Sequence, residues 1–208
     1  MTFTHNYVTA APEIFLAIAS MVLLMIGVFR GDGSTRLLSY LAVLAFAVTL
    51  AIVWQADSAG TVSFAGMYIS DRFTSFAKVL VLIASGAGLI MSQGYIKEEG
   101  MNRFEYPVLF VLATLGMLMM ISANDLIALY MGIELQSLAL YVIAAFNRDS
   151  LRSTEAGLKY FVLGALSSGM LLYGCSLIYG FTGSTGFAEI AAALKGVENG
   201  SVGLIVGI

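Results

Sequence analysis

Six apolar runs, each close to the length needed to cross a lipid bilayer, constrain this chain more than any other feature. About 20 helical residues span the roughly 30 Å hydrocarbon core of a membrane. The last run, 199–208, is too short to cross and predicts the opening of a seventh helix, so we expect the chain to be a fragment of a longer protein. We predict an all-α, polytopic transmembrane helix bundle, with six complete helices in the runs 14–29, 37–56, 73–96, 106–124, 126–147 and 160–188.

The composition also points to lipid as the solvent. Hydrophobic residues make up 59% of the 208 residues and charged residues only 11%, against roughly 25% charged residues in ordinary soluble domains. A soluble protein of this size has too little interior to bury so much apolar surface. The net charge of -3 argues against a nucleic-acid binder. The single cysteine, Cys175, excludes an internal disulfide framework.

Lysine and arginine alternate between successive loops. The loops at 30–36, 97–103 and 148–152 each contain two basic residues. The loops between them contain only Arg72, no basic residue and Lys195, respectively. Because basic loops stay in the cytoplasm, we predict that the N-terminus lies outside the cytoplasm and that the three basic loops lie inside.

Two connections between the runs are informative. The short segment 122–125 predicts a tight antiparallel hairpin, with Asp125 as the N-cap of the helix that follows. The long Gly-rich segment 182–201 contains apolar residues at helical spacing, which fits either a short helix on the membrane surface or a plain loop. Trp54 and Tyr68 lie near predicted helix ends, where we expect aromatic anchors at the membrane interface.

Glu134 is the ionisable residue that most needs an explanation, because it lies near the middle of an apolar run. Tyr130, Ser137 and Tyr141 lie on the same helical face, at spacings of three and four residues. We expect this stripe to face protein or water, as a possible polar pathway. Two interpretations stay open for Glu134: a structural carboxylate that holds helices together, and a site that binds a proton or a cation.

The other charges in or beside the runs have simpler alternatives. Lys159 lies at the start of the sixth run, where it fits a pathway residue, a snorkelling side chain or a surface salt bridge with Glu155. Lys78 lies five residues into its run, near the predicted outer end of the helix, so it fits a polar pathway or a side chain that snorkels to water. Glu13 begins a helix, where a carboxylate suits the helix dipole, and we expect a structural role.

One stretch of the sequence, 114–142, resembles a known family. Its segment 132–141, together with 155–161 and 164–168, is similar to the antiporter-like membrane subunits of the proton-pumping NADH–quinone oxidoreductase, complex I, and within them to the subunit N branch. The matching segments cover about a fifth of the chain.

This resemblance implies a fold and roles for two residues. Members of the family have fourteen helices with two inverted five-helix repeats, and carry a glutamate on the fifth helix and a lysine on the sixth. These correspond to Glu134 and Lys159. The implied division is three leading helices in 1–104 and the start of the first repeat in 105–208. The family's later lysines have no counterpart, because the sequence stops at Ile208.

The resemblance also implies a function. It is that of a membrane-arm subunit, multi-pass in the bacterial inner membrane, that couples electron transfer from NADH to quinone to proton translocation through Glu134 and Lys159. The sequence contains no catalytic, cofactor-binding or metal-binding motif. FMN, iron–sulfur clusters, NADH and quinone are therefore expected on other subunits. The expected partners are other membrane-arm subunits and lipid, with no nucleic acid. The alternatives are a subunit of a multi-subunit cation/proton antiporter and a passive scaffold.

Overall fold

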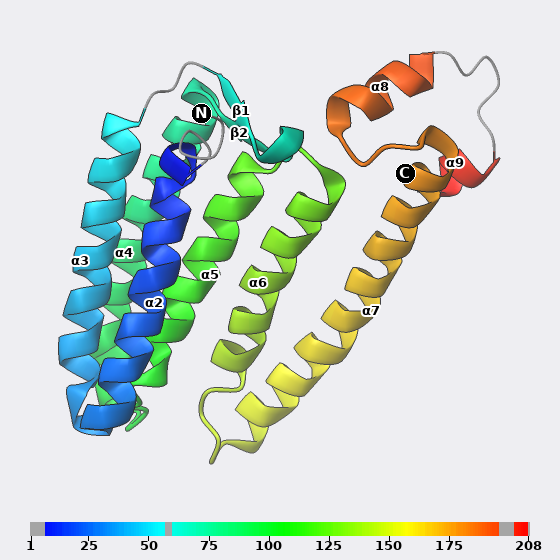
Figure 1. Cartoon of the computed structure of the whole chain (residues 1–208). Helices are drawn as coiled ribbons and strands as arrows, with labels where there is room; N and C mark the ends of the chain where they lie inside the picture. Colours follow the sequence, from blue (N-terminus) through cyan, green and yellow to red (C-terminus); the bar gives the residue numbers. More distant parts are fainter. Residues whose placement is uncertain (1–6, 57–59, 196–201, 208) are drawn as a thin grey trace.

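Six long helices dominate the computed structural model, which describes residues 7–56, 60–195 and 202–207 (Figure 1). Each is long and apolar enough to cross a membrane, which confirms the predicted count of six. They are α2 (Ala11–Arg30), α3 (Thr35–Gln55), α4 (Arg72–Glu98), α5 (Glu105–Ser122), α6 (Leu126–Ala144) and α7 (Leu151–Thr182). The shorter elements are η1 (Asp32–Ser34), β1 (Thr61–Ser63), η2 (Phe64–Gly66), β2 (Tyr68–Ser70), α8 (Phe187–Lys195) and α9 (Val202–Gly207).

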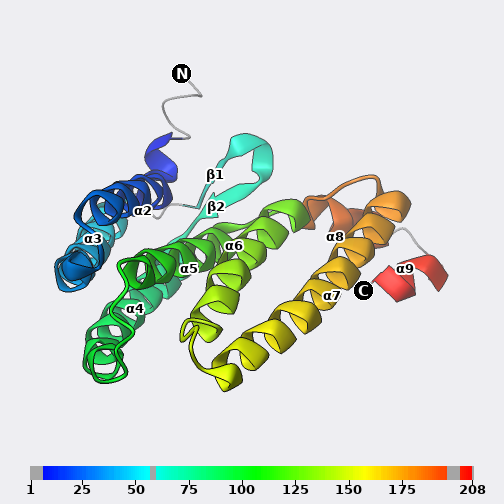
Figure 2. The ribbon, with the colours of Figure 1, turned by 90° about the horizontal axis from the view of Figure 1, so that it is seen from below.

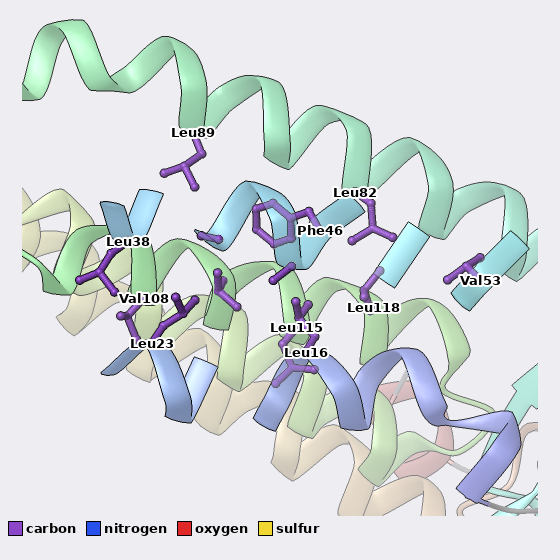
Figure 3. Packing of buried hydrophobic residues seen from close by; sticks show 13 residues of the cluster. Leu16, Leu23, Leu38, Phe46, Val53, Leu82, Leu89, Val108, Leu115 and Leu118 are labelled. Atoms are coloured by element: carbon purple, nitrogen blue, oxygen red, sulfur yellow. The ribbon is translucent and has the colours of Figure 1, made fainter. Parts of the chain in front are cut away.

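Helices α2, α3, α4 and α5 pack around a shared apolar core (Figure 3). Each helix contributes leucines from one face, so that face is buried and the opposite face points outward. In a bilayer, close side-chain packing rather than exclusion of water holds such helices together. The leucines with no more than 1% exposure are Leu16, Leu38, Leu82, Leu89 and Leu118.

A small β-hairpin covers one end of this bundle (Figure 1). Strands β1 and β2 are antiparallel, with Thr61 opposite Ser70 and Ser63 opposite Tyr68. The turn between them places Phe64 and Ala65 in the left-handed region, with φ of 52° and 54°. We call this end of the molecule the hairpin end.

Helices α5 and α6 form the predicted tight hairpin and approach each other through two glycines. A Cβ atom built at Gly116 lies 2.5 Å from the backbone nitrogen of Gln136, and one built at Gly132 lies 2.8 Å from that of Met120. No real side chain fits at these distances, so both glycines are needed for this helix contact. Asp125 caps α6 as predicted, because its Oδ1 accepts hydrogen bonds from the first-turn amides.

Helix α7 lies at the edge of the bundle, beside α6 (Figure 2). It begins at Leu151, nine residues before the predicted run, because Ser150 caps it and its first turns tolerate charges. It ends at Thr182, where Gly183 adopts a left-handed conformation with φ of 74°. Only 6% of its most apolar window is buried, compared with 50% for α5.

The three loops predicted to lie on the non-cytoplasmic side share the hairpin end. The backbone nitrogen of Asn124 donates to the carbonyl of Met67 at 2.9 Å, and that of Leu126 donates to the carbonyl of Thr185 at 2.9 Å. Within the long connection, α8 confirms the short helix over the plain loop. Its place on the membrane surface and the side that faces the cytoplasm remain predictions from the sequence.

Candidate functional site

Glu134 faces α7 and has two hydroxyl groups beside it. The Ser168 hydroxyl of α7 donates a short hydrogen bond to Glu134 Oε1. The Tyr130 hydroxyl lies 3.0 Å from the same Ser168 oxygen. Tyr130 precedes Glu134 by one helical turn, which places both on one face of α6. The three groups form a hydrogen-bonded row between α6 and α7, which we call the carboxyl–hydroxyl row.

The row gives Glu134 a hydrogen bond from Ser168 but no counter-charge. Across residues 7–56, 60–195 and 202–207, no lysine or arginine lies within ion-pair distance of its carboxyl group. A hydroxyl donates one proton while it accepts another, so the row has the chemistry to hold a proton and pass it on. Ionisable groups inside membrane helices commonly mark ion or proton pathways.

Two more residues of the predicted stripe lie on the same face of α6. The Tyr141 ring packs edge-on against Tyr160 of α7, with ring centroids 4.7 Å apart, and its hydroxyl group lies against Gly164. Ser137 lies between Glu134 and Tyr141 along the helix and is partly buried. Tyr130, Glu134 and Tyr141 therefore all face α7, while their role in proton transfer stays a prediction.

Lys159 is not brought to Glu134. It lies in the third turn of α7, not at its start, and its side chain is 70% exposed. Its Nζ contacts Glu155 Oε1 at 2.5 Å, which is the surface pair that the spacing had offered as an alternative. Nine residues separate Lys159 from Ser168, which is two and a half helical turns or about 14 Å along the axis. The two side chains thus leave α7 in opposite directions.

A second polar group lies inside the bundle near the hairpin end, and we call Glu13, Tyr68 and Lys78 the ion-pair cluster. Lys78 Nζ lies 2.6 Å from Glu13 Oε1 and donates to the Tyr68 hydroxyl at 2.8 Å. The Tyr68 hydroxyl donates to Glu13 Oε2 at 2.8 Å. Glu13 and Lys78 are 6% and 3% exposed. Each of the three residues contacts the other two.

The Tyr68 hydroxyl stays protonated in this cluster. Burial, followed by the negative charge of Glu13, raises the pKa of Tyr68 above its ordinary value of 10.0. The neutral phenol is the form that can donate to Glu13 and accept from Lys78 at once. Tyr68 therefore bridges the two charges.

The ion-pair cluster corrects two predictions. Lys78 does not snorkel to water and Tyr68 is not an interface anchor, because both are turned inward to Glu13. Glu13, for which we expected a structural role, lies in the first turn of α2 as predicted and also pairs with Lys78. Pairing offsets part of the cost of burying the two charges and carries neither to the surface. The predicted topology held a signal for this pair, since it put Glu13 and Lys78 at the same end of the bundle.

Comparison with known proteins finds one matching family model and many similar sequences. Residues 123–208 match the family model described as NADH:quinone oxidoreductase/Mrp antiporter, TM. A protein of Parvibaculum lavamentivorans named NADH-quinone oxidoreductase subunit N is 57% identical over 98% of this chain. One of Rhizobium meliloti named subunit N 1 is 58% identical over 95% of it. The chain spans 42% and 41% of the length of these two relatives.

Solved structures share the fold. A chain of respiratory complex I from Thermus thermophilus matches with a TM-score of 0.71 and 28% identity, over 94% of this chain and 42% of that one. A chain of the Mrp complex from Dietzia sp. matches with a TM-score of 0.68 and 20% identity, over 90% of this chain and 39% of that one. The second likeness concerns the fold alone.

Proposed function

This chain belongs to the family of proteins named NADH-quinone oxidoreductase subunit N, and on that premise we propose that it works in the membrane arm of a bacterial proton-translocating NADH:quinone oxidoreductase. Relatives that are 57% and 52% identical over 98% and 100% of this chain support the proposal. Its partners are the other membrane-arm subunits, and its place is the inner membrane. FMN, the iron–sulfur clusters and the sites for NADH and quinone belong to other subunits.

Glu134 is the residue that we propose takes up and releases protons. The observation that carries this is the contact of its carboxyl group with Ser168, and through Ser168 with Tyr130, between two membrane-spanning helices. Protons move along the carboxyl–hydroxyl row, while Ser137 and Tyr141 extend the polar face of α6. Lys159 acts as a second charged group, which must leave Glu155 and turn towards α6 to affect Glu134.

The magnitudes allow such a site to do work against a membrane potential. Moving one charge against 100 mV costs about 2.3 kcal/mol. Pairing or unpairing one ion in a low-dielectric interior changes its free energy by several kcal/mol. A partly buried carboxylate that gains and loses a counter-charge therefore has enough energy available. Electron transfer elsewhere in the complex would drive the change.

The test introduces the variants Glu134→Gln and Lys159→Met separately into the assembled complex. NADH:quinone turnover and proton pumping are then measured in membrane vesicles. We expect each variant to assemble and to lose pumping, most strongly for Glu134→Gln. The matched control is Glu98→Gln, at an exposed glutamate in the last turn of α4. Full coupled activity with normal assembly in both variants would end the proposal. A passive scaffold predicts poorer assembly and unchanged protons per NADH.

A subunit of a multi-subunit cation/proton antiporter is the second candidate. The family model that matches 123–208 includes Mrp antiporter subunits in its description, and the Dietzia Mrp chain has the same fold. Co-purification separates the two. Flavin and iron–sulfur subunits that purify with this chain support the oxidoreductase. Cation/proton exchange by the purified assembly in the absence of NADH supports the antiporter.

A further inference from the structure

The ion-pair cluster has no part in the proton path proposed above, and its chemistry suits a different task. Lys78 and Glu13 neutralise each other, and the neutral Tyr68 hydroxyl bridges them. Separating the two charges leaves each of them buried and unpaired, because Lys78 is only 3% exposed and Glu13 only 6%, and such an unpaired charge is costly. The cluster is therefore built to stay in one state.

Tyr68 connects the cluster to the turn that precedes α6. The residue lies in β2 and forms an antiparallel bridge with Ala123, directly after α5. The neighbouring carbonyls of Met67 and Gly66 accept hydrogen bonds from the backbone and the side-chain amide of Asn124, at 2.9 and 2.8 Å. Three consecutive hairpin residues thus hold the α5–α6 turn.

The connection continues from this turn to α7. Asp125 caps α6 through its Oδ1, while its Oδ2 accepts a hydrogen bond from the Thr185 hydroxyl at 2.5 Å. The backbone nitrogen of Leu126 donates to the carbonyl of Thr185 at 2.9 Å. Helices α6 and α7, which carry Glu134 and Ser168, are therefore tied to the hairpin at the same end.

In addition to the packing of α6 on α5, the hairpin links the ion-pair cluster to α6. Glu13 and Tyr68 share with Ala128 of α6 the lining of a mostly apolar cavity of about 440 Å³. The turn residues Phe64 and Ala65 have left-handed backbones, which non-glycine residues keep only where the surroundings fix them. The cluster on one side and Asn124 on the other supply that fixation.

We propose that Glu13, Tyr68 and Lys78 are positioning residues, an ion-pair lock that fixes the hairpin end of α6 and α7 and so sets the contact between Glu134 and Ser168. The part that concerns Glu134 rests on the function proposed above. The lock itself does not, because it is a statement about the order of the α5–α6 turn.

The test is Tyr68→Phe in the complete assembled complex, with two measurements. Hydrogen–deuterium exchange of the Asn124 and Leu126 amides is expected to become faster, while exchange in α3 stays unchanged. The rate of proton pumping per assembled complex is expected to fall by roughly two- to thirtyfold, the range for residues that act through a connecting network. Tyr40→Phe, at a 63% exposed tyrosine of α3, is the matched control and should change neither measurement.

Charge variants test the ion pair separately. Lys78→Met leaves the Glu13 carboxylate without its partner and should speed the same amide exchange. The double variant Glu13→Gln/Lys78→Met should restore slow exchange, because a glutamine oxygen still accepts from the Tyr68 hydroxyl. A double variant no better than Lys78→Met overturns the ion-pair lock. If Tyr68→Phe does not assemble, Asn124→Ala cuts the same link at the turn with the cluster intact.

The outcomes separate this proposal from the preceding one. Unchanged exchange at Asn124 and Leu126 in Tyr68→Phe overturns the lock, whatever Glu134→Gln does. Faster exchange with unchanged pumping, in a complex where Glu134→Gln abolishes pumping, overturns the link from the lock to Glu134. Full pumping in Glu134→Gln ends the proposed proton site, while the exchange data still decide whether the lock exists.

Discussion

Glu13 and Glu134 are both glutamates on membrane-spanning helices, and the structure treats them in opposite ways. Glu13 is 6% exposed and has a lysine nitrogen 2.6 Å away. Glu134 is partly buried and is hydrogen-bonded to a serine hydroxyl. A carboxylate with a buried counter-charge is held in an ion pair, whereas one with only a hydroxyl partner is free of such a pair. The partners, and not the residue type, separate the ion-pair cluster from the proposed proton site.

The same contrast runs through the regions that contain these residues. In the bundle of α2, α3, α4 and α5, helix α5 has half of its most apolar window buried. In the α6–α7 region the corresponding fractions are 17% and 6%. A closed bundle must pair its charges internally. Helices α6 and α7 bury less of their surface against the described part of the chain.

The largest effect on stability is expected in the bundle of α2, α3, α4 and α5. Lys78→Met should lower the free energy of unfolding by about 3–5 kcal/mol, because it leaves the Glu13 carboxylate buried and unpaired. The double variant Glu13→Gln/Lys78→Met should recover most of this loss. Thermal unfolding of the purified protein in detergent measures both. Equal losses in the single and double variants would show that the pair contributes through packing and not through charge.

The second largest effect on stability is expected at the contact between α5 and α6. Gly132→Ala should cost about 1–3 kcal/mol of stability, since the new methyl group collides with the backbone of α5 and the helices must separate. Gly169→Ala is the matched control, because a Cβ there meets nothing within 4 Å. Unfolding temperatures compare the two. A harmless Gly132→Ala would contradict the close approach of α5 and α6.

Glu134→Gln tests the comparison between the two glutamates in the α6–α7 region. We expect it to change stability by only about 1 kcal/mol, because the amide oxygen still accepts the hydrogen bond from Ser168 and no cation is left unpaired. The same unfolding measurement on Glu13→Gln, which strands Lys78, should show the larger loss. Similar losses in the two variants would mean that the two carboxylates have equivalent surroundings.

A smaller effect is expected at the exposed lysine. Lys159→Met should change stability by no more than about 1 kcal/mol, because its pair with Glu155 is solvent-exposed and screened. The contrast with Lys78→Met compares the same substitution at a buried and an exposed site. Unfolding at low and high salt measures it, and a large, salt-independent loss would contradict the exposed pair.

The smallest effect concerns pH. The pKa of Tyr68 is raised in the folded protein above its ordinary value of 10.0. The stability that its neutral phenol contributes is therefore fully present below pH 10.0 and is lost as pH rises through the folded pKa. Comparing wild type with Tyr68→Phe, we expect a constant stability difference below pH 10.0. A difference that shrinks already near neutral pH would mean that Tyr68 ionises in the cluster.

The local features of this protein could be predicted from its sequence. The six spans follow from the length of the apolar runs, the Asp125 cap from residue type and position, and the common face of Tyr130, Glu134 and Tyr141 from helical spacing. Each of these depends on residues within a few turns of one another. The end of α7 was placed too late, because the run 160–188 stays uncharged beyond Gly183, where the backbone turns.

What the sequence by itself determined is thus the set of membrane helices, the alternation of basic and non-basic loops between them, and one carboxyl group with polar neighbours. Only the tertiary structure decided which charges meet. Glu13 and Lys78 are 65 residues apart in the sequence and 2.6 Å apart in space, with a hairpin tyrosine between them. Lys159 stays with Glu155, its neighbour along α7. The physical reason is that the energy of a buried charge depends on partners that helix packing brings near, and helical periodicity does not name those partners.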